Sequence, residues 1–304
     1  MTESLVEDIT RLKRQKNAVI LGHYYLRDEM QDIADFVGDS LALSKQAMQT
    51  KANIIVFCGV HFMAETAKIL NPDKRVLLPD IEAGCSLADS CKAADLQKLK
   101  DQHPNAMVVS YINCTAEVKT LSDIICTSGN ALQIVNQLPK NQEILFVPDK
   151  NLGDYINKKT GRQMILWDGV CHVHNQLIAE RIIQLKQQHP EAALIAHPEC
   201  TAPVLALADF VGSTAAMLKF VQTDTNQSYI VATESGILYQ MRKLCPNKLF
   251  YIAESTEQCG CNDCPYMKLN TLEKLYQTLL NETPEIILSE ETIRKAQKPL
   301  LRML

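Results

Sequence analysis

Residues Gln102–Ala116 read QHPNAMVVSYINCTA, and residues Gln188–Ala202 read QHPEAALIAHPECTA. Seven of the fifteen positions are identical, and the two stretches lie at a constant offset of 86 residues. The segment Asn17–Tyr25 (NAVILGHYY) joins them with an offset of 88. Because a repeat of a whole supersecondary unit is strong evidence for architecture, the sequence predicts three copies of one structural unit.

Each copy shows the same order of elements along the chain. An apolar run such as MVVS or ALIA ends in a polar cluster, and helical stretches then alternate with further apolar runs. Strands that alternate with helices form parallel sheets covered by helices on both faces. We therefore predict an α/β protein of three homologous three-layer αβα repeats, arranged about a pseudo-threefold axis around a central active site. The predicted repeats span residues 1–86, 87–172 and 173–284, and a helix within 285–304 is expected to pack on the first.

The composition is that of an ordinary globular protein of 304 residues, with 46% hydrophobic and 22% charged residues. The net charge of −4 gives no basic surface of the kind that attracts nucleic acids or anionic membranes. No apolar run approaches the ~20 residues of a membrane-spanning helix. The first residues, MTESLVEDITRLKRQ, predict an amphipathic helix rather than an apolar leader. We expect a cytoplasmic protein that binds neither nucleic acid nor membrane.

The positions that recur in register are polar and lie where strands are expected to end. Ligands of open α/β sheets bind at the carboxyl ends of strands, and helix N-termini there favour anions. We therefore expect one shared site for small substrates rich in carboxylate or phosphate. The hydroxyl residues have an alternative role as helix N-caps, worth about 1 kcal/mol each. The positions in register are His23, Tyr111 and His197; Tyr25, Asn113 and Glu199; and Ser40, Ser128 and Thr214.

Three of the eleven cysteines follow the last predicted strand of each repeat, at separations of 86 and 93 residues. They are Cys85, Cys171 and Cys264. In a reducing compartment such cysteines favour metal or redox chemistry over disulfides. Thiolates are soft ligands that suit iron–sulfur clusters, zinc or copper(I). Three of them would hold a [4Fe–4S] cluster and leave one iron open to act as a Lewis acid.

The alternative for these cysteines is a structural zinc site. It would combine the CGCNDC stretch (Cys259–Cys264) with the imidazoles of His172 and His174, which follow Cys171 closely. Cys91 has no equivalent in the other repeats and is not expected to be a ligand.

The whole chain resembles the quinolinate synthase family of bacterial NAD biosynthesis. The motifs that carry the resemblance are GHYY, DFVGDS, FCGVHFMAETAKIL, SYINCTAEVK, CTSGNA, HPEC, VGST and CPYM. The resemblance implies three homologous αβα domains in a triangular array around one [4Fe–4S] cluster held by three cysteines. It also implies the condensation of iminoaspartate with dihydroxyacetone phosphate to quinolinate, with release of phosphate and water. L-Aspartate oxidase, which produces iminoaspartate, is the implied functional partner.

The resemblance also assigns roles to individual residues. Cys85, Cys171 and Cys264 match the cluster ligands. Glu199 is the candidate general base, and its implied catalytic partners are Tyr25, Tyr111 and His197. The implied substrate shell is His23, Ser40, Tyr111, Ile112, Asn113, Ser128, His197, Pro198, Glu199 and Thr214. Many relatives carry C-x₂-C-x₂-C at the last ligand, whereas this chain reads C-x-C-x₂-C, which weakens any role for Cys259 or Cys261.

Two other functions stay open at this point. An iron–sulfur hydro-lyase of a small hydroxy acid would share the chemistry of an open iron. A non-catalytic iron–sulfur sensor would need a partner or DNA surface, and it would have no use for three recurring polar strand ends.

Overall fold

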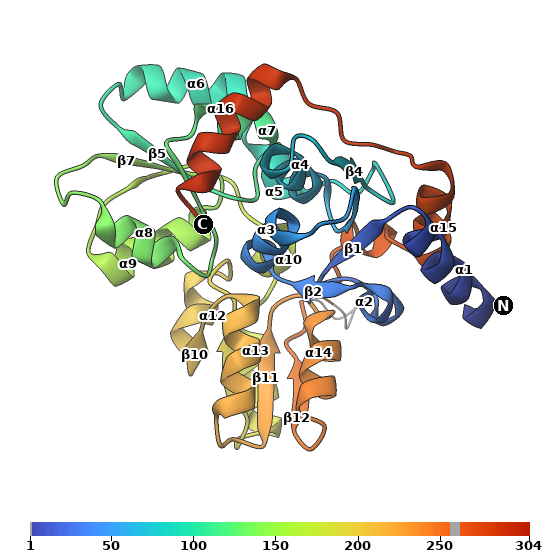
Figure 1. Cartoon of the computed structure of the whole chain (residues 1–304). Coiled ribbons are helices and arrows are strands. Elements are labelled where there is room, and N and C mark those ends of the chain that lie inside the picture. The colour runs from blue at the N-terminus through green and yellow to red at the C-terminus, as the bar shows by residue number, and fades with distance from the viewer. Residues whose placement is uncertain (1, 256–261) are drawn as a thin grey trace.

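The computed structural model describes residues 2–255 and 262–304. In this part of the chain the strands form three four-stranded sheets, and neighbouring strands within each sheet run parallel. The strand order across the sheet is the same in all three. Numbered along the chain within one unit, the strands lie side by side in the order second, first, third, fourth. Figure 1 shows the three sheets in separate parts of the molecule, coloured blue, green and yellow to orange. The predicted α/β class, with three parallel sheets flanked by helices, is confirmed.

The first sheet comes from the N-terminal part of the chain. Its strands are β1 (Ala18–His23), β2 (Phe36–Gly38), β3 (Ile54–Cys58) and β4 (Arg75–Leu77). The helices beside it are α1 (Thr2–Gln15), α2 (Asp28–Ile33), α3 (Ser40–Gln49) and α4 (His61–Leu70). The central strand β3 reads IIVFC and is buried along its whole length, as expected for a strand covered on both faces.

The second sheet repeats this pattern. Its strands are β5 (Met107–Tyr111), β6 (Ile124–Cys126), β7 (Ile144–Val147) and β8 (Ile165–Leu166). Its helices are α5 (Ser86–Ser90), α6 (Ala93–Gln102), α7 (Ala116–Leu121), α8 (Ala131–Gln137) and α9 (Lys150–Thr160).

The third sheet completes the set. Its strands are β9 (Ala193–Ala196), β10 (Phe210–Val211), β11 (Ser228–Ala232) and β12 (Leu249–Ile252). Its helices are α10 (His172–Asn175), α11 (Ala179–Gln188), α12 (Ala202–Leu207), α13 (Thr214–Thr223) and α14 (Ile237–Leu244).

One contact recurs identically in all three units. An aspartate just before the second strand accepts a hydrogen bond from a backbone N–H near the start of the first strand. The three pairs, each at 2.8 Å, are Ile20–Asp35, Val108–Asp123 and Leu194–Asp209. The repeat seen in the sequence is therefore also a repeat of side-chain geometry.

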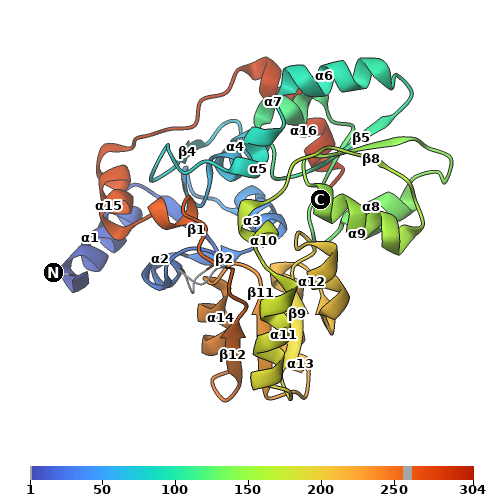
Figure 2. The same ribbon diagram turned by 180° about the vertical axis from the view of Figure 1, so that it is seen from behind.

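The C-terminal segment returns to the first two units, as Figure 2 shows from behind. It contains a 3₁₀ turn, η1 (Met267–Leu269), and the helices α15 (Leu272–Asn281) and α16 (Glu290–Leu301). Helix α15 packs on α1, whereas α16 lies against α4, α7 and β6. Ser289 caps α16 by accepting a hydrogen bond from the backbone N–H of Thr292, and the helix lies within the predicted range 285–304.

The largest hydrophobic core spans the first and second units. It includes Leu21 and Ile55 from the first sheet, Val109 and Phe146 from the second, and Leu300 from α16. Each unit is small, so sharing a core lets both bury more apolar surface than either would alone. Among the described helices, none has the length and apolar character that crossing a bilayer requires.

Candidate active site

A pocket lies where the first strands of the three sheets end. His23 is the last residue of β1, Tyr111 is the last residue of β5, and His197 directly follows β9. All three side chains are buried and line the pocket. The predicted site residues that the structure brings together here are His23, Tyr25, Ser40, Cys85, Tyr111, Asn113, Ser128, Cys171, His197, Glu199, Thr214 and Cys264.

Two predicted residues do not contribute side chains to this pocket. Ile112 follows Tyr111 but packs into the hydrophobic core, with 1% of its surface exposed. Pro198 is buried between two residues that line the pocket, yet it is not among the lining residues itself. Both residues lie just past the ends of strands, Ile112 in a bend and Pro198 in a turn closed by the hydrogen bond from Cys200 N to His197 O.

The three cysteines occupy equivalent places in their units. In each unit, the backbone carbonyl two residues before the cysteine accepts a hydrogen bond. The donor is the backbone N–H of a residue shortly after the third strand, at the same aligned position in all three units. The pairs are His61 N to Ala83 O at 2.7 Å, Lys150 N to Gly169 O at 2.8 Å, and Ser235 N to Asn262 O at 3.4 Å. Cys264 is further from Cys171 along the sequence than Cys171 is from Cys85. The backbone contact nevertheless places Cys264 in register with Cys85 and Cys171.

The thiols of these cysteines influence one another. Burial raises the pKa of Cys85 to about 12 and that of Cys264 to about 11, and it raises the pKa of Cys171 well above its ordinary value. Cys264 adds to the rise at Cys85, and Cys85 adds to the rise at Cys171. Neighbouring buried thiolates need a cation between them, and a metal deprotonates the thiols that coordinate it. The donor set therefore fits an iron–sulfur cluster bound by three soft ligands.

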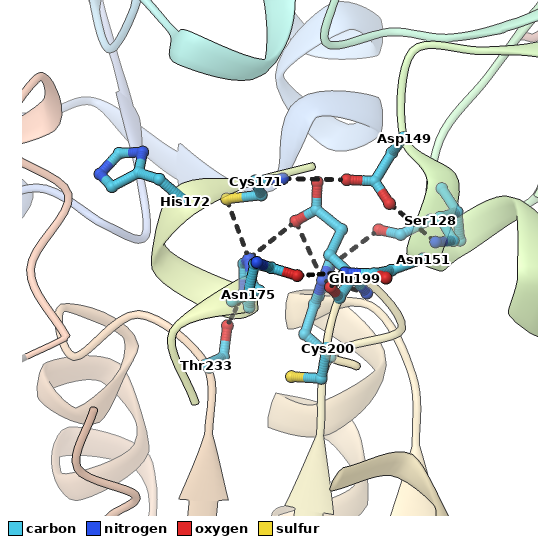
Figure 3. Close-up of polar contacts among 12 residues, drawn as sticks. Ser128, Asp149, Asn151, Cys171, His172, Asn175, Glu199, Cys200 and Thr233 are labelled. Carbon is cyan, nitrogen blue, oxygen red and sulfur yellow. Dashed lines mark hydrogen bonds and ion pairs between the residues drawn. The ribbon is translucent and has the colours of Figure 1, made fainter. Parts of the chain in front are cut away.

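Glu199 lies between two histidines. Its Oε2 is 3.0 Å from Nδ1 of His174 and 3.2 Å from Nδ1 of His197, and the two imidazoles stack with centroids 4.7 Å apart. Burial raises the pKa of Glu199, but the interactions with His174 and His197 outweigh burial and hold the pKa below its ordinary value. Glu199 is therefore ionised at neutral pH. Nδ1 of His174 also lies 3.2 Å from Sγ of Cys171. Figure 3 shows Cys171 beside Glu199.

This arrangement offers a second way to bind a metal. The ligand atoms of Cys171, His174 and Glu199 all lie within 4.8 Å of one another, close enough to share one metal ion. The zinc site considered from the sequence is different, because Nδ1 of His172 contacts Oγ of Ser86 at 2.8 Å. Cys259 and Cys261, the other proposed zinc ligands, lie outside the described residues.

A chain of hydrogen bonds leads from Tyr25 to Glu199. The Tyr25 hydroxyl lies 2.8 Å from Oγ1 of Thr233, and that oxygen lies 2.8 Å from Nε2 of His174. Since Nδ1 of His174 faces the Glu199 carboxylate, Nδ1 carries the proton and Nε2 accepts from Thr233. Burial raises the pKa of Tyr25 well above its ordinary value, although the Thr233 hydrogen bond opposes this. The chain can therefore pass a proton only in a defined direction, from Tyr25 towards His174.

The three predicted hydroxyl residues, Ser40, Ser128 and Thr214, are not the N-caps of their helices. Helix α3 is capped by Asp39 and helix α13 by Ser213, each one residue before the predicted hydroxyl. Ser40 and Thr214 thus begin their helices without acting as caps. Ser128 instead places its Oγ 3.2 Å from Nε2 of His197.

Two polar atoms that face the pocket region are buried without a hydrogen-bond partner among the described residues. They are Oδ1 of Asn113 and Oε1 of Glu199. Buried acceptors are nearly always satisfied in folded proteins, so these atoms are suited to a bound ligand.

Sequence reasoning missed several residues of the site. Asp39, Thr127 and Glu234 line the pocket, and so does His174, which the sequence suggested only as a ligand of the alternative zinc site. Thr233 links Tyr25 to His174. Asp39 could have been found, since it stands beside Ser40 in the repeated segment DFVGDS. Thr233 could not, because its contact with Tyr25 joins residues 208 positions apart.

Comparison with known proteins places these observations in a family. A family model described as "Quinolinate synthetase A protein" matches residues 7–304. The quinolinate synthase of Microcystis aeruginosa is 57% identical over 304 residues, which is 100% of this chain and 95% of the relative. That of Nostoc sp. is 58% identical over 296 residues (97% and 91%), and that of Chloroherpeton thalassium 57% over 301 residues (99% and 94%). Because these matches extend over nearly the whole chain, this chain belongs to the quinolinate synthase family.

Proposed function

We propose that this chain condenses iminoaspartate with dihydroxyacetone phosphate to quinolinate, releasing phosphate and water in NAD biosynthesis. The observation that carries the proposal is that three in-register cysteines and the polar strand ends of three sheets line one pocket. The relatives are named quinolinate synthase, which supports the same activity. The enzyme would work in the cytoplasm on small anionic substrates, with L-aspartate oxidase as the source of iminoaspartate.

The three units are residues 1–86, 87–172 and 173–284, related by a pseudo-threefold axis through the pocket. Their common strand order supports this arrangement, as do the equivalent backbone contacts near the cysteines. Each unit would supply one ligand, Cys85, Cys171 or Cys264, to a single [4Fe–4S] cluster. When bound, the cluster supplies a Lewis-acidic iron that lacks a protein ligand and can polarise a substrate oxygen.

The substrate anions would bind at the start of two helices. Ser40 and Thr214 are the first residues of α3 and α13, where backbone N–H groups and the helix dipole favour phosphate or carboxylate. Because Asp39 and Ser213 already cap these helices, the two hydroxyl groups are left for the substrate. The unpaired Oδ1 of Asn113 would accept a hydrogen bond from a substrate O–H or N–H.

His23 would bind substrate as a neutral hydrogen-bond donor. Burial, aided by the nearby His197, lowers the pKa of His23 to about 3. Its Nδ1 accepts a hydrogen bond from the backbone N–H of Tyr25 at 3.2 Å, so the single proton of the neutral ring lies on Nε2. His23 can therefore orient a substrate oxygen without adding charge to the pocket.

Proton transfers would use the chain from Tyr25 to Glu199. Glu199 acts as general base through Oε1, since Oε2 is engaged with His174 and His197. Tyr25 takes a proton from substrate as its own hydroxyl proton moves to Thr233, and Thr233 passes its proton on to Nε2 of His174. Tyr111, with a pKa that burial and then Glu199 raise well above its ordinary value, remains protonated and can donate a hydrogen bond.

A direct assay tests the proposal and separates it from the alternatives. Anaerobic, reconstituted protein is mixed with freshly generated iminoaspartate and dihydroxyacetone phosphate. We expect quinolinate and inorganic phosphate to form in equal amounts. A hydro-lyase would instead dehydrate a hydroxy acid without releasing phosphate. A sensor would convert neither iminoaspartate nor dihydroxyacetone phosphate. Absence of quinolinate from protein that carries its full complement of iron and sulfide would contradict the proposal.

A further inference from the structure

Two buried carboxylates occupy equivalent positions in the second and third units. The pairing of β7 with β5 and of β11 with β9 aligns Phe146 with Val231. Three residues further along lie Asp149 and Glu234, and both side chains are 0% exposed. The sequence repeat conceals this pair, because the offset between them is 85 rather than 86 and the residue type changes.

Asp149 uses both of its oxygens on backbone N–H groups. Oδ1 accepts from Leu152 at 2.7 Å and thereby caps α9, and Oδ2 accepts from Cys171 at 3.3 Å. Figure 3 shows the carboxylate beside the backbone nitrogen of Cys171. The side chain therefore connects the end of the third strand to the residue that carries the thiol.

Glu234 makes the corresponding contacts in the third unit. Oε1 accepts from the backbone N–H of Cys264 at 3.0 Å and from Nζ of Lys268 at 2.8 Å, and Oε2 accepts from the backbone N–H of Gly236 at 2.7 Å. A Cβ atom at position 236 would lie 2.9 Å from this Oε2, so only glycine allows the approach.

The first unit shows that the fold itself does not require the carboxylate. There the aligned residue is Val60, three positions after Phe57, and the sheet forms with the same strand order. Cys85 and Cys171 are both N-cap residues of short helices, and the carbonyl of each accepts an N–H four residues later at 2.9 Å. The carboxylate contact in the second unit is therefore additional to this shared backbone geometry.

We propose that Asp149 and Glu234 are positioning residues for the cluster, which hold the backbone of Cys171 and Cys264 so that their thiolates meet that of Cys85. The inference rests on the cluster of the proposed function. It requires a carboxylate, because each side chain accepts backbone N–H groups on both oxygens and an amide has only one acceptor oxygen. Partners that orient metal ligands typically change metal affinity 10–100-fold when mutated.

The test uses Asp149→Asn and Glu234→Gln, with Asp123→Asn and Asp209→Asn as matched controls. The controls remove carboxylates that accept a backbone N–H in the same two units, but from Val108 and Leu194 rather than from a cysteine. In reconstituted protein, iron release to a chelator should be about tenfold or more faster in the two test variants than in the controls. In apoprotein, hydrogen exchange should accelerate at the Cys171 amide in Asp149→Asn and at the Cys264 amide in Glu234→Gln.

The outcomes separate this inference from the proposed function. A parent protein that binds no iron–sulfur cluster would overturn both. A parent that binds the cluster, with test variants that release iron and exchange these amides at control rates, would overturn the inference alone. If circular dichroism shows that Glu234→Gln does not fold, Glu234→Asp replaces it, because it keeps both oxygens but withdraws them by one methylene from Cys264. The inference then predicts faster iron release from that variant too, and release at the control rate would overturn it.

Discussion

The first strand of each unit preserves the threefold repeat at its start but not at its carboxyl end. Near the start of these strands, the same residue makes the same 2.8 Å contact in every unit, through Asp35, Asp123 and Asp209. At the carboxyl ends, the aligned residues are His23, Tyr111 and His197, followed two positions later by Tyr25, Asn113 and Glu199. The aspartate contact serves the same structural purpose in every unit, so the same residue suits all three. A pocket for asymmetric substrates needs different chemical groups from each side. The repeat is therefore kept where it builds the fold, and within the pocket it is altered at these strand ends but kept at the three cysteines and the three hydroxyl positions.

The largest effect is expected at Glu199, the carboxylate at a position where the other units carry Tyr25 and Asn113. Glu199→Gln keeps the size of the side chain but removes the base, so kcat should fall by at least about 10²-fold. The cluster and the fold should remain. Steady-state kinetics, with visible absorption and iron content as controls, measure both. As a control, Glu180→Gln changes an exposed carboxylate of the same unit and should leave kcat unchanged. Near-normal turnover of Glu199→Gln would remove Glu199 from the mechanism.

The next effect concerns the hydroxyl positions, where all three units keep similar chemistry. Ser128→Ala and Thr214→Val should each raise KM for a substrate by about tenfold or more, since a hydrogen bond to a charged group contributes about 1.5–3 kcal/mol. Initial-rate kinetics for each substrate in turn identify which anion each residue binds. If KM stays at the parent value and only the melting temperature falls, these hydroxyl groups serve the fold rather than the substrate.

A smaller effect is expected at Thr233, which joins the first unit to the third through Tyr25 and His174. Thr233→Val keeps the shape but cannot pass a proton, so kcat should fall about tenfold, below the 10²–10⁴ typical of a direct acid or base. Thr233→Ser retains the hydroxyl and should recover most of the activity. Equal losses in the valine and serine variants would show that packing, rather than the hydrogen-bond chain, matters at this position.

The smallest effect is a pH dependence of stability at His23. The pKa of His23 is lowered to about 3 in the folded protein, against about 6.5 in the unfolded chain. Between these values only the unfolded state binds the proton, so this histidine makes the protein less stable as pH falls below about 6.5. Between pH 7.5 and 5.5 it should lower the free energy of unfolding by about 1 kcal/mol. Denaturant unfolding of apoprotein should show a weaker pH dependence in His23→Asn than in the parent; parallel curves would contradict the shifted pKa.

Much of the fold and half of the pocket chemistry could be read from the sequence. The repeat predicts the three parallel sheets, because each apolar run had to be a buried strand, and it aligns His23, Tyr111 and His197 at the mouth of one pocket. The offset of Cys264 from Cys171 differs from the others, so the sequence alone left a local zinc site open for that cysteine.

The rest depends on contacts that no sequence register records. Glu234 and Asp149 are aligned by strand pairing, but their offset and residue type hide the relation. Thr233 and His174 become important only because folding brings them to Tyr25 and Glu199. The caps of α3 and α13 are Asp39 and Ser213, one position before the expected caps Ser40 and Thr214, because each helix begins one residue earlier than expected.

The most direct test of the account is the iron and acid-labile sulfide bound per chain after anaerobic reconstitution of the single cysteine variants. Cys85→Ser, Cys171→Ser and Cys264→Ser should each lose most iron, sulfide and the brown absorption, because one ligand comes from each unit. Cys245→Ser, a change at another buried free cysteine, should retain the content of one [4Fe–4S] cluster. If Cys85→Ser and Cys264→Ser keep their metal, while Cys171→Ser loses metal that carries no sulfide, the metal is bound locally beside His174 and Glu199. That result would contradict a cluster shared by three units.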